Sequence, residues 1–127
     1  MMGKQNVIVE KSFDFAVRIV NLYKYLCDEK REFVLSKQLL RSGTSIGANV
    51  SEAEQAQSRK DFAAKMNIAL KEASETEYWL RLLVKTNYID EKQFTSVMVD
   101  CEEVKKLLHA IVKTAGENIA RGNKNGQ

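Results

Sequence analysis

The chain has 127 residues, of which 44% are hydrophobic and 29% are charged, and its formal net charge is +3. This length fits one domain with a single core, and the composition excludes an intrinsically disordered chain. The small positive excess permits anionic partners without requiring them.

Proline is absent from the sequence, and hydrophobic residues recur at spacings of three and four, which together favour helices throughout. The first predicted helix begins at Ser12, a candidate N-cap. Its apolar stripe comprises Phe15, Ile19, Leu22 and Leu26. We expect residues 1–11 to form a flexible arm, in which residues 6–9 could be extended.

The second predicted helix is capped by Ser36, and its stripe comprises Leu39, Gly43, Ile46, Val50 and Ala53.

The third predicted helix opens at Ser58 or Asp61 and carries the longest unbroken stripe. This stripe comprises Phe62, Met66, Ala69, Ala73, Thr76, Leu80 and Leu83. A short turn follows at residues 87–90, and Asp90 with Gln93 resembles a capping box at the start of a fourth helix. The fourth stripe comprises Phe94, Val97, Cys101, Val104, Leu108, Ile111 and Ala115. With residues 121–127 expected to be a flexible tail, the sequence predicts one all-α domain over residues 1–127, an antiparallel up-and-down four-helix bundle.

The sequence offers few residues for catalysis or metal binding. His109 is the only histidine, and it falls opposite the apolar stripe of the fourth helix. Cys27 and Cys101 have no metal-like spacing, so we interpret them as reduced core thiols. The paired Glu-x-x-His motifs of bundle-core metal sites are absent. We therefore predict no enzymatic activity, no cofactor, no metal and no small-molecule substrate.

The second predicted helix contains a ten-residue stretch without a charge, SGTSIGANVS, at residues 42–51. Its outward line is poor in charge for a water-exposed surface, which predicts an oligomer interface. This line comprises Arg41, Thr44, Ala48, Ser51 and Gln55. The alternative is that the segment is a small-residue helix packed within one bundle, with Ser42, Ser45, Asn49 and Glu52 needing partners wherever they are buried.

The third predicted helix has a line of cations and one aromatic residue opposite its core stripe. This cation stripe comprises Lys60, Lys71, Tyr78, Arg81 and Lys85. At 1.5 Å per residue it is about 37 Å long, enough to follow several phosphates of RNA or DNA. The alternative is an ordinary solvated face, in which the flanking Glu72, Glu75 and Glu77 cancel most of the positive potential.

Two blocks of this sequence resemble a known family. They are LSKQLLRSGTSIGANVSEA at residues 35–53 and DFAAKMNIALKEASETEYWLRLL at residues 61–83. The chain is similar to the four-helix-bundle proteins encoded in intervening sequences of bacterial 23S rRNA genes. Residues that match the family pattern are Gln38, Leu39, Ser42, Ser45, Ile46, Asn49, Glu52, Phe62, Ala69, Glu72, Thr76 and Trp79.

The resemblance implies a bacterial cytoplasmic protein, an up-and-down bundle and a ring-like homopentamer with a basic surface. A related bundle, the accessory protein of diversity-generating retroelements, works beside a reverse transcriptase and binds nucleic acid. Our first hypothesis is therefore an oligomeric accessory protein that contacts RNA or DNA mainly through phosphate. The second is a protein-binding or structural homo-oligomer without a nucleic-acid role. Since no apolar run approaches the roughly 20 residues that span a bilayer, we expect no membrane partner.

Overall fold

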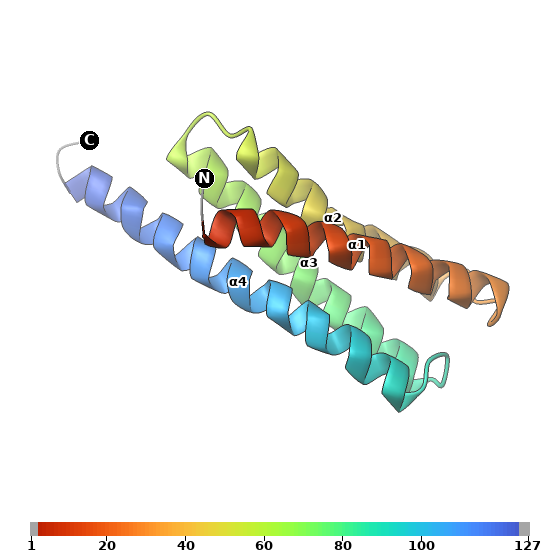
Figure 1. The fold of residues 1–127 in the computed structure, drawn as a ribbon. Helices are drawn as coiled ribbons and strands as arrows, with labels where there is room; N and C mark the ends of the chain where they lie inside the picture. The colour runs from red at the N-terminus through yellow and green to blue at the C-terminus, as the bar shows by residue number, and fades with distance from the viewer. Residues whose placement is uncertain (1–2, 125–127) are drawn as a thin grey trace.

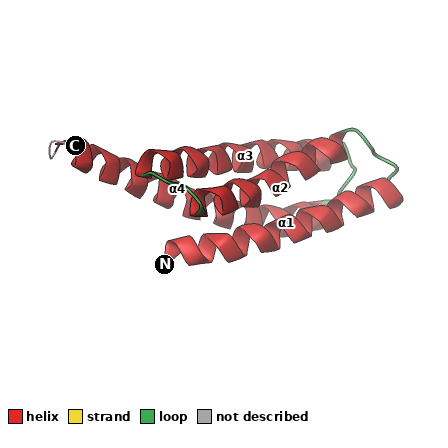
Figure 2. Cartoon of the chain, turned by 90° about the horizontal axis from the view of Figure 1, so that it is seen from above, coloured by secondary structure: helices red, strands yellow, loops and turns green. Residues whose placement is uncertain are grey.

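The computed structural model describes residues 3–124, which form four helices and no strand. The helices are α1 (Lys4–Asp28), α2 (Leu35–Glu54), α3 (Arg59–Lys85) and α4 (Glu91–Lys124). Consecutive helices run in opposite directions, and the loops that join them lie at the two ends of the molecule (Figures 1 and 2). Each helix packs against two others, so that α1 contacts α2 and α4, and α3 contacts the same pair. This closed ring of neighbours confirms the predicted all-α bundle and its antiparallel up-and-down order.

One core runs along the axis of the bundle. Every member of the four predicted stripes is buried except Phe62 and Phe94, which are half-buried against the same core. Such burial is the main stabilising contribution in a bundle of this size, because each fully buried Leu or Ile side chain contributes about 1.5–3 kcal/mol. None of the helices over residues 3–124 has both the length and the apolar character that a bilayer crossing demands.

The first helix is longer than predicted. It begins at Lys4, so the expected arm was wrong for residues 4–11, including the extended stretch at 6–9. The physical reason is that Ile8 lies seven residues before Phe15 and extends the same apolar stripe, where it is completely buried. Ser12 is therefore not a cap but an interior residue, and its hydroxyl donates to the carbonyl of Val9 over 3.3 Å.

The last helix is also longer than predicted. It continues to Lys124, so the expected flexible tail was wrong for residues 121–124. Residues 1–2 and 125–127 of the predicted arm and tail lie outside the described part of the chain.

The second helix begins with a cap that the sequence did not predict. Ser36 was expected to be the N-cap, but α2 starts one residue earlier, at Leu35, and the capping group is the Glu32 side chain. Its carboxylate accepts hydrogen bonds from the backbone N–H groups of Val34, Leu35 and Ser36 at 3.1, 3.0 and 2.7 Å. Ser36 acts in the opposite sense, because its hydroxyl donates to the Glu32 carbonyl over 2.8 Å. A carboxylate at this place also meets the positive end of the helix dipole.

This cap makes stability depend on acidity. Burial of the Glu32 carboxyl is the largest single influence and opposes its ionisation, but the backbone hydrogen bonds from Leu35, Ser36 and Val34 together outweigh it and lower the pKa of Glu32. A carboxyl whose pKa is lower in the folded state contributes stability above its unfolded pKa of about 4.3, and loses it as the pH falls through the folded value.

We expect Glu32→Ala to lower the free energy of unfolding by about 2 kcal/mol at pH 7, the upper end of the range for helix caps, because three N–H groups lose their acceptor. The difference should shrink below about pH 4 as the wild-type carboxyl becomes protonated. Urea unfolding of both proteins between pH 3 and 7 measures this, and a constant difference across that range would contradict the assignment.

The caps of α3 and α4 confirm the sequence prediction. The Ser58 hydroxyl accepts the backbone N–H of Asp61 at 3.0 Å. At α4, the Asp90 carboxylate accepts from the N–H of Gln93 at 2.7 Å, and the Gln93 side chain accepts from the N–H of Asp90 at 2.9 Å. The pair is therefore a reciprocal capping box.

Candidate interaction surfaces

The two sequence blocks that carry the family pattern form the α2–α3 seam. At its centre the hydroxyls of Ser42 and Thr76, both fully buried, are hydrogen-bonded at 3.0 Å. The other polar residues bordering the α2 stripe also have partners, since Asn49 donates to the carbonyl of Ser45 at 2.9 Å and Glu52 pairs with Lys65 at 2.8 Å. No buried polar side-chain atom in the described residues is left without a hydrogen-bond partner. Of these contacts, Ser42–Thr76 and Glu52–Lys65 join α2 to α3, whereas the Asn49–Ser45 bond lies within α2.

An ionic network lies along the same seam nearer to the surface. The Arg41 guanidinium contacts the Glu72 carboxylate at 3.3 Å and is also paired with Glu75. The Glu75 carboxylate accepts a hydrogen bond from the Trp79 indole at 3.1 Å. This bond is the main cause that lowers the pKa of Glu75, with Arg41 adding to it, while Glu75 and then Glu72 raise the pKa of Arg41. Arg41, which was predicted to face outward from α2, therefore lies against α3.

The cation stripe lies on the outer side of α3. All five of its residues are exposed, with Tyr78 at 58%. Over residues 3–124, none of its four cations has a carboxylate within ion-pair distance. The ring of Tyr78 packs edge-on against Trp79, with centroids 5.0 Å apart, so one side of it is held in place.

The acids that flank this stripe are bound to cations elsewhere. Glu72 and Glu75 pair with Arg41 on α2, and Glu77 pairs with Lys105 on α4 at 2.7 Å. Glu72 and Glu75 share Arg41, and Glu77 has Lys105, so two cations offset part of the charge of these three carboxylates. The acids therefore reduce the potential of the stripe less than three free acids would.

An apolar surface runs over α1 and α2. Gln55 of the predicted interface line is exposed directly after the end of α2, and Thr44, Ala48 and Ser51 are exposed or half-exposed on α2 itself. A hollow of about 380 Å³ lies beside them, and α1 forms its other wall. The residues that line the hollow are Val9, Ser12, Phe13, Ala16, Thr44, Gly47, Ala48, Val50, Ser51 and Glu54. We call this the α1/α2 face.

The α1 wall of this face is the part that the sequence analysis missed. Phe13, which lines the hollow, is 67% exposed, and Val17, one helical turn further along α1 and outside the lining, is 47% exposed. Their spacing at i and i+4, outside the core stripe of the first helix, was the signal that could have found them. An exposed phenylalanine beside the charge-free stretch at residues 42–51 is unusual for a surface that faces only water.

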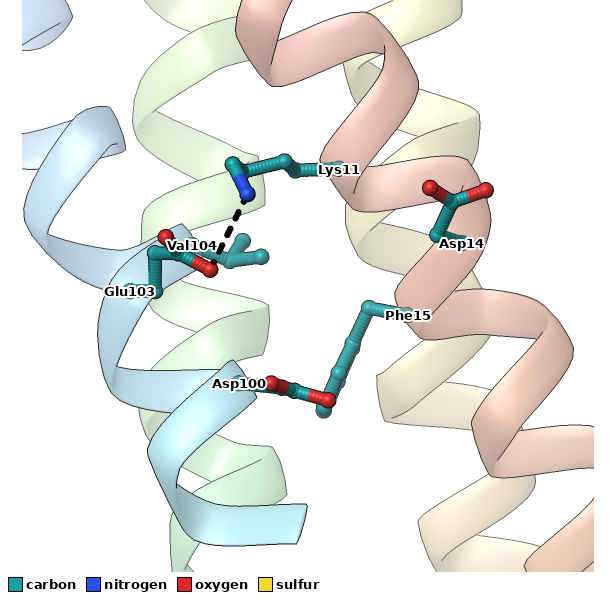
Figure 3. Close-up of a pocket in the computed structure, with 6 residues that line it drawn as sticks. All are labelled: Lys11, Asp14, Phe15, Asp100, Glu103 and Val104. Atoms are coloured by element: carbon teal, nitrogen blue, oxygen red, sulfur yellow. Dashed lines mark ion pairs between the residues drawn. The ribbon is translucent and has the colours of Figure 1, made fainter. Parts of the chain in front are cut away.

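A second hollow, of about 190 Å³, lies between α1 and α4 and holds three carboxylates (Figure 3). Glu103 is paired with Lys11 at 3.2 Å, and Asp100 is paired with Arg18 at 2.6 Å. Two of the three acids, all but Asp14, are therefore neutralised by cations. Within residues 3–124, no group of three or more His, Cys, Asp or Glu side chains is arranged to hold a metal ion.

The residues considered for catalysis lie apart from one another. His109 is exposed on α4, whereas Cys101 is buried on the same helix and Cys27 is half-buried on α1. Both thiols are free. Burial is the main cause that raises the pKa of Cys101 to about 12, which leaves its thiol protonated and unreactive at neutral pH.

The fold defines the protein as an all-α four-helix bundle. The chain belongs to the family of 23S rRNA-intervening sequence proteins, whose family model matches residues 4–110. It is similar to a protein of unknown function from the S23 ribosomal protein family of Bacteroides thetaiotaomicron VPI-5482, known from a crystal structure. The two chains are 64% identical with a TM-score of 0.86, and the match covers 87% of this chain and 99% of the other. No curated protein matches this chain.

Proposed function

We propose that this protein is a non-enzymatic, oligomeric accessory protein of the bacterial cytoplasm that contacts RNA or DNA mainly through phosphate. The observation that carries this proposal is the cation stripe of α3, whose cations are exposed and unpaired within the described residues while the neighbouring acids are bound to Arg41 and Lys105. Cations in a row about 37 Å long suit a polyanion with regularly spaced charges. Tyr78 adds a ring that an unpaired base could contact.

Assembly would strengthen this contact. One subunit offers only a few phosphate contacts, but a ring that repeats the stripe raises the effective concentration of every further contact. The homopentamer implied by the family resemblance is the assembly we propose. The α1/α2 face supports it, because it combines an exposed Phe13 with Ala48 in the uncharged stretch at residues 42–51.

Binding to nucleic acid should depend steeply on salt. If four phosphates are neutralised, the slope of log affinity against log salt on duplex DNA is about −3.6, so affinity should fall about 150-fold between 50 and 200 mM salt. The double variant Lys71→Ala/Arg81→Ala removes two of the four contacts and should flatten the slope to about −1.8. Fluorescence anisotropy on labelled RNA and DNA measures both slopes.

A matched control is Lys24→Ala/Lys113→Ala, which removes two exposed cations from α1 and α4 instead. Its slope should stay close to that of the wild type. If the wild type binds neither RNA nor DNA at low salt, the proposed function is wrong. If both double variants change the slope equally, binding is real but does not lie on α3.

A second candidate function is a structural or protein-binding homo-oligomer without a nucleic-acid role. The α1/α2 face favours it on its own, since apolar contact between subunits needs no polyanion. Assembly without any salt-sensitive nucleic-acid binding is the result that would select this function.

A further inference from the structure

The loop between α1 and α2, residues 29–34, is held by hydrogen bonds from both helices. At the end of α1, the N–H of Glu29 donates to the Tyr25 carbonyl at 2.8 Å and the N–H of Glu32 donates to the Leu26 carbonyl at 3.0 Å. At the start of α2, the Glu32 carboxylate is the cap described above, and Glu32 is only 8% exposed. The backbone that carries the exposed side chains of this loop is therefore held in place.

Two of those side chains are apolar. Phe33 is 47% exposed and the adjacent Val34 is 72% exposed. The Arg31 guanidinium lies over the Phe33 ring, 5.3 Å from its centroid, in a cation–π contact. The backbone of Arg31 has φ of 55°, a left-handed conformation that favours glycine and disfavours an L side chain. The chain therefore carries a guanidinium at this place against the local backbone preference.

This loop lies at the same end of the bundle as the last residues of the cation stripe. The contacts Ser42–Thr76 and Glu52–Lys65 set the antiparallel register of α2 and α3, and this register brings the start of α2 beside the end of α3. Arg81 and Lys85 are the last two cations of the stripe and lie at that end. The α1–α2 and α3–α4 loops lie together at the same end of the bundle (Figure 1).

We propose that this end of the bundle binds an unpaired nucleotide, with its base against Phe33 and Arg31 and its neighbouring phosphates on Lys85 and Arg81. The inference rests on the proposed function and specifies its ligand as a nucleic acid with a junction between duplex and single strand. Aromatic rings and guanidinium planes are the groups on which proteins stack unpaired bases. Net charge does not carry the argument, because the acids Asp28 and Glu29 precede the loop.

A protein partner with an apolar side chain is the competing occupant of this end. It would use Phe33 and Val34 but would gain nothing from a guanidinium held over the ring or from continuity with the cation stripe. These two features favour the nucleotide, and a substitution that keeps apolar bulk but removes the flat ring separates the two occupants.

The test compares a blunt RNA duplex with the same duplex bearing a single-stranded overhang. The overhang should raise wild-type affinity about tenfold or more, the usual effect of stacking one base. Both Phe33→Ala and Phe33→Leu should abolish this gain while leaving affinity for the blunt duplex unchanged. If Phe33→Leu keeps the gain, the overhang does not stack on the Phe33 ring, and the proposed site for the base is overturned.

The variant Arg31→Gly distinguishes a loss of the binding site from a loss of folding. It removes the guanidinium and relieves the left-handed backbone, so the melting temperature should stay unchanged or rise by up to about 4 °C while the overhang gain falls. An undiminished gain in this variant would remove Arg31 from the site. If wild type binds the blunt duplex but the overhang adds nothing, this inference fails and the proposed function stands; if it binds neither RNA, both fail.

Discussion

Ala48→Glu is expected to convert the proposed homo-oligomer into monomers without unfolding the subunits. Ala48 is exposed in the single chain, and glutamate is a good helix former, so the bundle should tolerate the change. In an assembly that covers the α1/α2 face, the same glutamate would be a buried charge without a partner, which costs several kcal/mol at each interface. Multi-angle light scattering at high micromolar concentration measures the change in mass.

The control for this experiment is Ala64→Glu, the same substitution at an exposed alanine of α3, which should leave the mass unchanged. Phe13→Ser tests the other wall of the face and should weaken assembly as well, because it removes apolar surface from the proposed interface. The monomer should stay folded, because a ring that is 67% exposed contributes little to its stability. A wild-type protein that remains monomeric would contradict the assembly itself. Unchanged mass in both Ala48→Glu and Phe13→Ser would place the interface elsewhere.

The interior of the bundle was predictable from sequence because periodicity alone determines which side of a helix is buried. The ends of the helices were less predictable from the sequence. Ser12 and Ser36 were both predicted as caps, since their hydroxyls suit that role, yet both lie inside helices. Ile8 extends α1 through a tertiary contact, and Glu32 caps α2 from three residues ahead of it, so neither outcome follows from local preference.

The candidate surfaces were likewise predictable from sequence only in part. The cations of the α3 stripe and the small residues of α2 follow from helical geometry, and the structure places them on outer sides as expected. How far the flanking acids cancel the positive potential of the stripe depends instead on their ion-pair partners from other helices. Glu75 is bound by Arg41 from α2, and Glu77 by Lys105 from α4, over sequence separations of 34 and 28 residues. Such pairing is set by the register between helices, which no single stripe encodes.

A close approach between α1 and α2 at Gly43 gives the second large expected effect. A Cβ added there would lie 2.8 Å from two carbons of the Ile19 side chain and 3.2 Å from its Cβ. Ile19 is branched and fully buried, so α1 itself would have to move away. We expect Gly43→Ala to lower the free energy of unfolding by about 2 kcal/mol, because overpacking outweighs the better helix propensity of alanine.

Gly116→Ala is the matched substitution, and its effect on the free energy of unfolding should have the opposite sign. Nothing lies within 4 Å of a Cβ added at Gly116, so only the helix propensity acts, and stability should rise by about 1 kcal/mol. Denaturant unfolding of the two variants therefore separates backbone preference from helix packing.

A double variant tests the contact between Gly43 and Ile19 directly. Once Ile19→Ala has removed the clashing carbons, adding Gly43→Ala should lower the free energy of unfolding less than Gly43→Ala does alone, with a coupling energy of about 1 kcal/mol or more. Strict additivity of the two changes would mean that α1 and α2 do not meet at this glycine.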